Sequence, residues 1–455
     1  MINAEICQQA RLARDARFDG LFFTAVKSTG IYCRPICPAR PPAEQQVSYY
    51  QSAAEASAAG YRPCLRCRPD SAPGSAAWQG TDTTVQRALR LIDDGALQQQ
   101  TQAELASRLG ISERYLRKLF QQQLGLAPKQ YALAQQVLFA KKLLHETRLP
   151  ISCIAFHAGF NSVRRFNDAF KQQLKLCPAD IRRHPKDSGA MLQLTLSYRP
   201  PLAWTQMLDF WRARTLDGID WVNGQRYGRS FSFMQQDGWF EVAPAADNNL
   251  TLQLHWPAKQ GLFSLIRHLR RLLDLDANML QIEQQLSAHP LFNAGIVSGL
   301  RIPGVWNAWE AGVRAVLGQQ VSVAGARTQL NRLVQALGQP LSEHKRLFPT
   351  PQAVAQSDLH MIKVPQARRA TLTALAQYVM AQPDAAPQQW LAIKGIGPWT
   401  VNYACLRGLS DSDIWLGGDL GVQKALAKAG TSANIDSLSP WRSYATFQLW
   451  FSLGG

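Results

Sequence analysis

The chain has 455 residues and a formal net charge of +17 at neutral pH. This length suggests about three domains, and the excess of basic residues favours a polyanionic partner, most simply nucleic acid. No apolar run approaches the ~20 residues of a membrane-spanning helix, and no secretory signal peptide opens the sequence, which argues against a membrane or exported protein.

Four cysteines near the N-terminus form two close pairs. They are spaced C-x3-C and C-x2-C with a loop between the pairs, as Cys33, Cys37, Cys64 and Cys67. Two thiol pairs separated by a loop can fold around one tetrahedral Zn²⁺ ion, which the spacing therefore predicts. Four unrelated buried cysteines are the alternative, and a disulfide framework is not expected in an intracellular chain.

The residues around these cysteines match a family pattern. The stretches FFTAVKSTGIYCRPICPARPP (22–42) and YRPCLRCRPD (61–70) resemble the N-terminal domain of the Ada family of alkylation-response regulators. The resemblance implies a small α+β zinc domain over residues 1–75, in which a zinc thiolate irreversibly takes a methyl group from a methylated DNA phosphate. Carried over by position, the methyl acceptor is Cys33.

The chemistry of such a site is consistent with these residues. Zinc holds a thiolate deprotonated at neutral pH, and four thiolates around one divalent ion leave a net charge of about −2. Methylating one sulfur removes one negative charge, so repair would raise the affinity for DNA. Four flanking basic residues are candidates for phosphate contacts, with ordinary solvated charge as the alternative: Lys27, Arg34, Arg40 and Arg66.

The segment over residues 80–187 has the pattern of an all-α domain. TQAELASRLGISERYLRKLF and ISCIAFHAGFNSVRRFNDAF each read as helix, Gly-containing turn and helix, with a long helix between them. Two such units resemble the AraC-type DNA-binding domain, whose second helix in each unit enters the major groove. This places five basic residues near DNA, with a solvated basic face as the alternative: Arg114, Arg117, Lys118, Arg164 and Arg165.

The pattern changes to strands over residues 190–258. Short alternating runs such as LTLQLHW predict an antiparallel β subdomain, with turns at Asp237-Gly238 and at 247–249. From 259 to 455 the pattern is helical again. The chain is therefore predicted to be multidomain and mainly α.

A glycine-rich hairpin lies in the stretch LAIKGIGPWTVNYACLRG (391–408), between two predicted apolar helices. Gly395 and Gly397 let the backbone turn sharply and present N–H groups to a phosphate. Taken alone, the hairpin could be a plain helix–helix turn. Followed by a Gly-rich loop and Asp419, it resembles the helix-hairpin-helix DNA glycosylases, and over residues 190–455 the inducible 3-methyladenine DNA glycosylases.

The resemblance implies hydrolysis of an N-glycosidic bond. Asp419 would stabilise the oxocarbenium character of the sugar, although a helix-start Asp can also be a simple N-cap. Aromatic side chains would stack on a flipped-out cationic base, and Gln320 would fill the gap that the base leaves. Strand-cutting relatives carry a lysine where this chain has Trp399, so a monofunctional enzyme is expected. The implied pocket walls are Trp399, Tyr403 and Trp441.

Together these segments predict a DNA repair and regulatory protein that binds one Zn²⁺. Its expected partners are alkylated and promoter double-stranded DNA and RNA polymerase, and it is expected to be a cytoplasmic, nucleoid-associated monomer. The glycosylase resemblance also implies a monovalent cation at the hairpin carbonyls. Three alternatives stay open: a regulator whose C-terminal part binds DNA without catalysis, a glycosylase whose N-terminal modules only target it to DNA, and a zinc-containing DNA-binding protein without methyl transfer.

Overall fold

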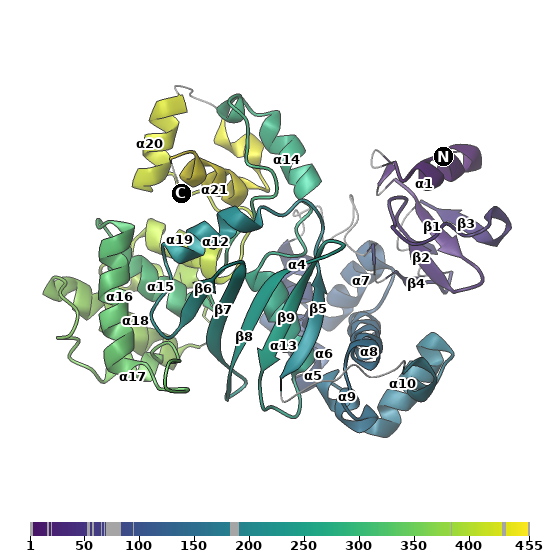
Figure 1. Ribbon diagram of the computed structural model, residues 1–455, viewed down its shortest axis with the longest axis horizontal. Coiled ribbons are helices and arrows are strands. Elements are labelled where there is room, and N and C mark those ends of the chain that lie inside the picture. The colour runs from purple at the N-terminus through teal and green to yellow at the C-terminus, as the bar shows by residue number, and fades with distance from the viewer. Residues whose placement is uncertain are drawn as a thin grey trace. The chain divides into compact units, whose positions relative to one another are not determined.

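The computed structural model describes residues 3–453 except 16–17, 20, 52–54, 57–58, 65, 68, 70–82, 94, 183–190, 384 and 430–433. The predicted domain boundaries near residues 75–80 and 187–190 lie outside the described residues. The chain divides into two compact units, Met1–Lys186 with Lys259–Arg267, and Asp187–Ala258 with His268–Gly455. Each unit is described by itself, with the element labels of Figure 1.

After helix α1, the first unit forms a four-stranded sheet in the order β3-β1-β2-β4. β1 pairs antiparallel with β2 and β3, whereas β4 pairs parallel with β2. Cys33 is the last residue of β2 and Cys64 follows β4, so this pairing brings the two cysteine pairs to one edge. The element bounds are α1 (Ala4–Ala13), β1 (Phe23–Val26), β2 (Ile31–Cys33), η2 (Glu44–Gln46), β3 (Val47–Tyr50) and β4 (Arg62–Pro63).

The following helices contain both predicted helix-turn-helix pairs, α6 with α7 and α9 with α10. Ser112 and Ser162 cap the second helix of each pair, accepting the backbone N–H groups of Tyr115 and Arg165 at 3.2 Å. The bounds are α4 (Thr83–Asp93), α5 (Ala96–Gln99), α6 (Gln102–Arg108), α7 (Glu113–Leu124), α8 (Pro128–Glu146), α9 (Ile151–His157), α10 (Val163–Leu174) and α11 (Pro178–Ile181).

The second unit begins with an antiparallel sheet in the order β5-β9-β8-β7-β6, as the alternating pattern predicts. Helix α12 and strand β6 come between β5 and β7 along the chain, and neither was predicted. The bounds are β5 (Leu192–Ser197), α12 (Trp204–Arg212), β6 (Asp220–Asn223), β7 (Arg226–Phe233), β8 (Gln236–Ala245) and β9 (Asn249–His255).

The predicted turn at Asp237-Gly238 is wrong, because both residues lie inside β8. The turn between β7 and β8 is made by Met234 and Gln235, with φ of 50° and 58°, the geometry of a tight hairpin that follows the strand twist. Gly238 serves another purpose: a Cβ there would lie 2.5 Å from the carbonyl oxygen of His255 on β9. The glycine permits close strand approach.

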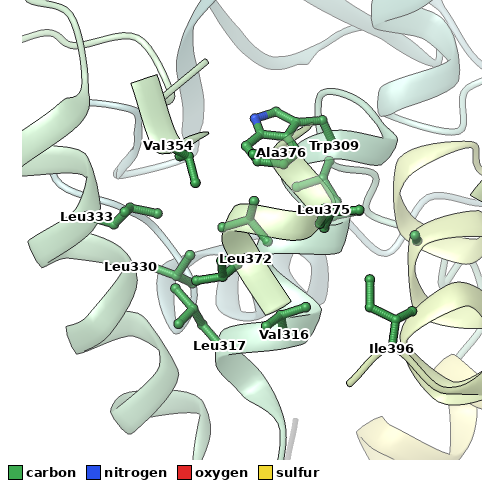
Figure 2. Packing of buried hydrophobic residues seen from close by; sticks show 14 of the residues in the cluster. Trp309, Val316, Leu317, Leu330, Leu333, Val354, Leu372, Leu375, Ala376 and Ile396 are labelled. Carbon is green, nitrogen blue, oxygen red and sulfur yellow. The ribbon is translucent and has the colours of Figure 1, made fainter. Parts of the chain in front are cut away.

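The helical part of this unit packs around α15, in which every residue from Trp309 to Leu317 is buried. Figure 2 shows its side chains meeting those of α16 and α18. Helix α13 (Leu262–Leu272) belongs to the first unit up to Arg267 and to the second from His268. The bounds of the remaining helices are α14 (Met279–Ser287), η4 (Pro290–Phe292), α15 (Ala308–Gly318), α16 (Val323–Leu337), α17 (Pro351–Ala355), α18 (Gln366–Ala381), η5 (Pro387–Ala392), α19 (Pro398–Gly408), α20 (Leu420–Ala429), η6 (Ile435–Leu438) and α21 (Arg442–Ser452).

The hairpin joins η5 to α19, so a short 3₁₀ helix precedes it where an α-helix was expected. Among the helices that the structure describes, none combines the length and apolar character needed to cross a bilayer.

Candidate zinc centre, DNA-facing helices and base-binding cavity

The four predicted ligands converge on one point. The Sγ atoms of Cys33, Cys37, Cys64 and Cys67 all lie within 4.8 Å of one another, and those of Cys37 and Cys64 are 3.8 Å apart. Zinc–sulfur bonds of about 2.3 Å in a tetrahedron place neighbouring sulfurs about 3.8 Å apart. The donor set therefore fits a tetrahedral Zn²⁺.

The thiols of this centre are electrically interdependent. Hydrogen bonding to Cys37 and Cys64 raises the pKa of Cys33, whereas hydrogen bonding to Cys33 lowers the pKa of Cys64. Opposite shifts arise because neighbouring thiols this close cannot all ionise without a compensating cation. A divalent ion would relieve that conflict.

The arginine that follows the first ligand is buried. Arg34 is only 4% exposed, and its guanidinium donates to Asp19 Oδ1 at 2.6 Å and to the Cys67 carbonyl at 3.1 Å. The predicted phosphate contact does not fit this placement, because the guanidinium is already paired with the Asp19 carboxylate inside the domain. Lys27, Arg40 and Arg66 are exposed.

The basic residues predicted for the two helix-turn-helix units all lie on the second helix of a pair. Arg114, Arg117 and Lys118 are exposed on α7, and Arg164 and Arg165 are exposed on α10. Arg117 forms an ion pair with Glu113 one helical turn earlier. The inward faces of these helices are apolar, and the rings of Phe166 and Phe170 lie 5.3 Å apart. Each helix thus presents a basic side outward.

A cavity of about 970 Å³ lies within the second unit. Its walls come from the end of α12, the α15–α16 connection, α19, the start of α20 and the end of α21. Its lining includes aromatic rings, basic groups and one carboxylate, together with glutamine and apolar side chains. The predicted residues Gln320, Trp399, Tyr403 and Asp419 are all among them.

The carboxylate of Asp419 accepts four N–H groups. Oδ1 accepts the backbone N–H of Gly421 at 2.9 Å and of Val422 at 3.1 Å, and the indole Nε1–H of Trp450 at 2.9 Å. Oδ2 accepts the indole Nε1–H of Trp399 at 3.2 Å. Asp419 therefore caps α20 and also faces the cavity, so the two alternatives raised by its sequence position coexist in one geometry.

The aromatic walls differ from those predicted. Trp399 and Tyr403 line the cavity with ring centroids 5.5 Å apart. Trp441 lies outside it: the ring is 8% exposed and packs on Tyr444. Trp450 lies in its place, and because nine residues are about two and a half helical turns, Trp441 and Trp450 project to different sides.

The α15–α16 connection carries the predicted wedge. Gln320 is exposed and has a φ of 55°, an uncommon conformation for a residue with a side chain. The preceding Gln319 donates from Nε2 to the Gly395 carbonyl at 3.2 Å and to Thr400 Oγ1 at 3.1 Å. These bonds tie the connection to the hairpin.

The two hairpin glycines have different surroundings. Gly395 has a φ of 91°, and a Cβ there would lie 2.2 Å from Thr371 Oγ1. A Cβ on Gly397 would meet no atom within 4 Å. Gly395 is required by internal packing, whereas the backbone at Gly397 is open to approach from outside.

Comparison with known proteins identifies all three parts of the chain. Family models match residues 6–70 as the metal binding domain of Ada, 105–184 as a helix-turn-helix domain and 193–307 as the AlkA N-terminal domain. A Mycobacterium tuberculosis protein described as a probable bifunctional transcriptional activator/DNA repair enzyme AlkA is 37% identical over 99% of this chain and 96% of its own length. The chain belongs to this AlkA-type bifunctional family.

Two Escherichia coli proteins resemble separate parts of this AlkA-type chain. DNA-3-methyladenine glycosylase 2 is 32% identical over 57% of this chain and 97% of its own length. The bifunctional transcriptional activator/DNA repair enzyme Ada is 40% identical over 30% of this chain and 36% of its own length. The predicted family membership and domain types are therefore confirmed.

Sequence reasoning missed several cavity residues that this AlkA-type fold assembles. Trp450 lies in the same PWRSYATFQLW stretch as Trp441, and only the helix geometry distinguishes them. Three arginines also line the cavity: Arg214, Arg314 and Arg407. Arg314 and Arg407 lie within the apolar helices α15 and α19, which was a visible signal, since arginines are rarely buried without a partner or a purpose.

Proposed function

We propose that this chain is a monofunctional DNA glycosylase that releases 3-methyladenine and related alkylated bases, joined to a methyl-accepting, DNA-binding regulator. The observation that carries the enzymatic part is the carboxylate of Asp419 beside the rings of Trp399, Tyr403 and Trp450 in one cavity. A flipped-out base can stack on these rings, and an electron-poor cationic base gains most from them.

The geometry supports a direct electrostatic role for Asp419. Cleavage of the N-glycosidic bond develops positive charge on the deoxyribose, which a preorganised carboxylate stabilises. Two indole N–H groups and the first N–H groups of α20 fix its orientation. Trp399 follows the hairpin where strand-cutting relatives carry lysine, so water is the expected nucleophile.

The decisive experiment measures base release from methylated duplex DNA by wild type and by Asp419→Asn. Asparagine caps helices as well as aspartate does, so the variant keeps the start of α20 while losing the charge. Release should fall on the order of 10²–10³-fold, the loss typical of removing one stabilising group from a transition state. Asp436→Asn, an exposed aspartate outside the cavity, should release bases at the wild-type rate.

The zinc centre supports a second, stoichiometric reaction. In this proposal, the Cys33 thiolate attacks the methyl carbon of a methylphosphotriester. The carbon–oxygen bond breaks, its electron pair stays on the phosphate oxygen, and a phosphodiester and an S-methylcysteine result. A bound Zn²⁺, held by the four cysteines, would keep the thiols deprotonated. Mass spectrometry of the chain after incubation with methylated DNA should find one methyl group on Cys33.

The regulatory part of the proposal links this reaction to promoter binding. Losing one negative charge at Cys33 lowers repulsion of the DNA backbone, while α7 and α10 read the sequence in the major groove. Sequence-specific DNA binding and contact with RNA polymerase would then activate transcription. Promoter affinity that is equal before and after methylation of Cys33 would instead favour a module that only targets the glycosylase to DNA.

The remaining parts of the proposal are the domain spans, the assembly state and the hairpin cation. We assign residues 1–75 to the zinc domain, 80–187 to the helix-turn-helix domain, 190–258 to the β subdomain and 259–455 to the helix-hairpin-helix domain. The protein would act as a cytoplasmic, nucleoid-associated monomer. A monovalent cation held by the hairpin carbonyls would supply positive charge for binding a phosphate, so DNA affinity should fall when potassium and sodium are replaced by a bulky organic cation at equal ionic strength.

The principal rival is a methylation-sensing regulator whose C-terminal part binds DNA without catalysis. A folded, zinc-loaded wild-type protein that releases no base from alkylated DNA would establish this rival and eliminate the glycosylase.

A further inference from the structure

The cavity that contains Asp419 has more positive than negative charge on its walls. Among its lining residues, one carboxylate faces five basic groups: Arg214, Arg314, Arg327, Arg407 and Lys424. An excess of positive charge does not favour a cationic base, so stacking alone does not account for the character of this cavity. Which of these basic groups can bind a ligand depends on the partners that each already has within the protein.

Two of the inner arginines are engaged by the protein itself. Arg314 donates from Nε to Glu310 Oε1 at 2.8 Å. Arg407 donates from Nε to the Pro303 carbonyl at 2.6 Å and from Nη1 to the Tyr403 hydroxyl at 3.1 Å. These two guanidiniums are largely committed to structural contacts.

Arg214 is different. It is half-buried just after the end of α12, with its guanidinium carbon 3.7 Å from the centre of the Phe210 ring. Its Nη1 donates to the Phe210 carbonyl at 3.2 Å. Within the described part of the chain, no carboxylate lies at ion-pair distance from Arg214, and this bond is the one that its guanidinium makes. The stacked ring holds the guanidinium in place while N–H donors remain for a ligand.

The charge of Arg214 survives in this setting. Burial, and then repulsion from Arg407, lower its pKa to about 10, while attraction to Asp419 opposes that shift. The group is still protonated at neutral pH. Asp419 and Arg214 therefore present opposite charges to the same cavity.

Breaking the glycosidic bond moves its electron pair onto the base. A cationic alkylated base leaves as a neutral molecule, whereas a neutral base leaves as an anion. Water adds hydroxide to C1′ of the sugar. The remaining proton goes to solvent when the damaged base was cationic, and to the departed anion when the base was neutral. Only the second kind of leaving group develops negative charge that a guanidinium can stabilise.

We propose that Arg214 donates hydrogen bonds to the departing base and is the residue on which the release of neutral purines with a carbonyl acceptor depends. The inference rests on the proposed glycosylase function and assigns a specificity-determining residue within it. Arg214 would contribute little to the release of cationic bases and much to the release of neutral ones.

The test uses two duplexes whose damaged bases share a carbonyl group but differ in charge. 7-Methylguanine and hypoxanthine both carry the carbonyl at position 6, but only the former is cationic, so the pair separates leaving-group charge from carbonyl recognition. Single-turnover release is measured with saturating full-length protein for wild type, Arg214→Gln and Arg214→Lys. The matched control is Arg212→Gln, an exposed arginine paired with Asp209 at the same end of α12.

For Arg214→Gln, hypoxanthine release should fall roughly 10–100-fold more than 7-methylguanine release, as expected for a lost hydrogen bond to a charged group. Arg214→Lys should recover part of the difference because it keeps the charge, and Arg212→Gln should match wild type. Equal losses on both substrates, or unchanged hypoxanthine release, would overturn the assignment of Arg214. Absence of release of either base by wild type would instead overturn the proposed glycosylase.

Discussion

The zinc centre and the Asp419 cavity solve opposite electrostatic problems. At the zinc centre four acidic thiols meet, and only an external cation can compensate their charges. In the cavity, one carboxylate is surrounded by N–H donors and arginines, so the protein itself supplies the compensation. In the proposed reactions, methyl transfer to Cys33 changes the charge of the zinc centre once, whereas base release leaves the groups around Asp419 unchanged and able to act again.

The difference also concerns how each site is built. The four cysteines lie within 35 residues of chain and on one edge of a small sheet. The cavity residues run from Arg214 to Leu453 and come from five parts of the second unit. The first site should therefore be sensitive to loss of the metal and of nearby ion pairs. The second should be sensitive to changes in side-chain packing and orientation.

The largest expected effect is zinc removal. Chelation should unfold the N-terminal domain, because metal binding contributes about 10–16 kcal/mol to folding of small structural zinc sites. Base release should persist, since the cavity lies in a separate compact unit. Zinc content, proteolysis of residues 1–70 and base release are measured on the same sample.

Cys177→Ser serves as the control for this prediction, because Cys177 is exposed and far in sequence from Cys33, Cys37, Cys64 and Cys67. Zinc content should stay at one ion per chain. If base release disappeared together with the metal, the two sites would not be independent.

The next effect concerns the buried ion pair beside the thiols. Arg34→Gln leaves the Asp19 carboxylate buried without its partner, which typically costs about 3–5 kcal/mol. The midpoint of thermal unfolding, monitored by the release of zinc to a dye, should shift strongly to lower temperature. Arg40→Gln, at an exposed position, should leave the midpoint unchanged, and an unchanged midpoint for both variants would show that Arg34 is not structural.

The hairpin offers a matched pair of glycines near the cavity. Gly395→Ala combines an unfavourable positive φ with an overlap at Thr371, at a cost of roughly 2–4 kcal/mol in the free energy of unfolding. Gly397→Ala should change that free energy little but weaken binding to undamaged duplex DNA, because its methyl group projects outward. Equal destabilisation in urea titrations of the two variants would contradict the different roles assigned to them.

The smallest effect tests the aromatic wall. Trp450→Phe keeps a ring but removes the indole N–H that donates to Asp419. Hydrogen bonds to charged groups contribute about 1.5–3 kcal/mol, so single-turnover base release should fall roughly 10–100-fold. Base release by Trp441→Phe, which changes a residue outside the cavity, should fall less than twofold. The reverse ranking would restore Trp441 as the pocket residue and remove Trp450.

Much of the fold could be predicted because its signals are local. The Gly-containing turns and serine caps of both helix-turn-helix units depend on residues next to each other in the chain, and Ser112 and Ser162 cap as their positions suggest. The failures involve partners distant in sequence. Gly238 resembled a turn residue, but its neighbour is His255 on another strand. Arg34 resembled a surface charge, but Asp19 binds it inside the domain.

The amino-acid sequence alone determined the zinc ligands, the family and the order of the modules, because closely spaced cysteines and continuous motifs carry that information locally. Only the tertiary structure decided which groups meet in the cavity. Asp419 was visible as a helix-start carboxylate, but its two indole donors come from α19 and α21. Arg214 and Trp450 were invisible as partners, since their proximity depends on how five separate segments pack rather than on any spacing along the chain.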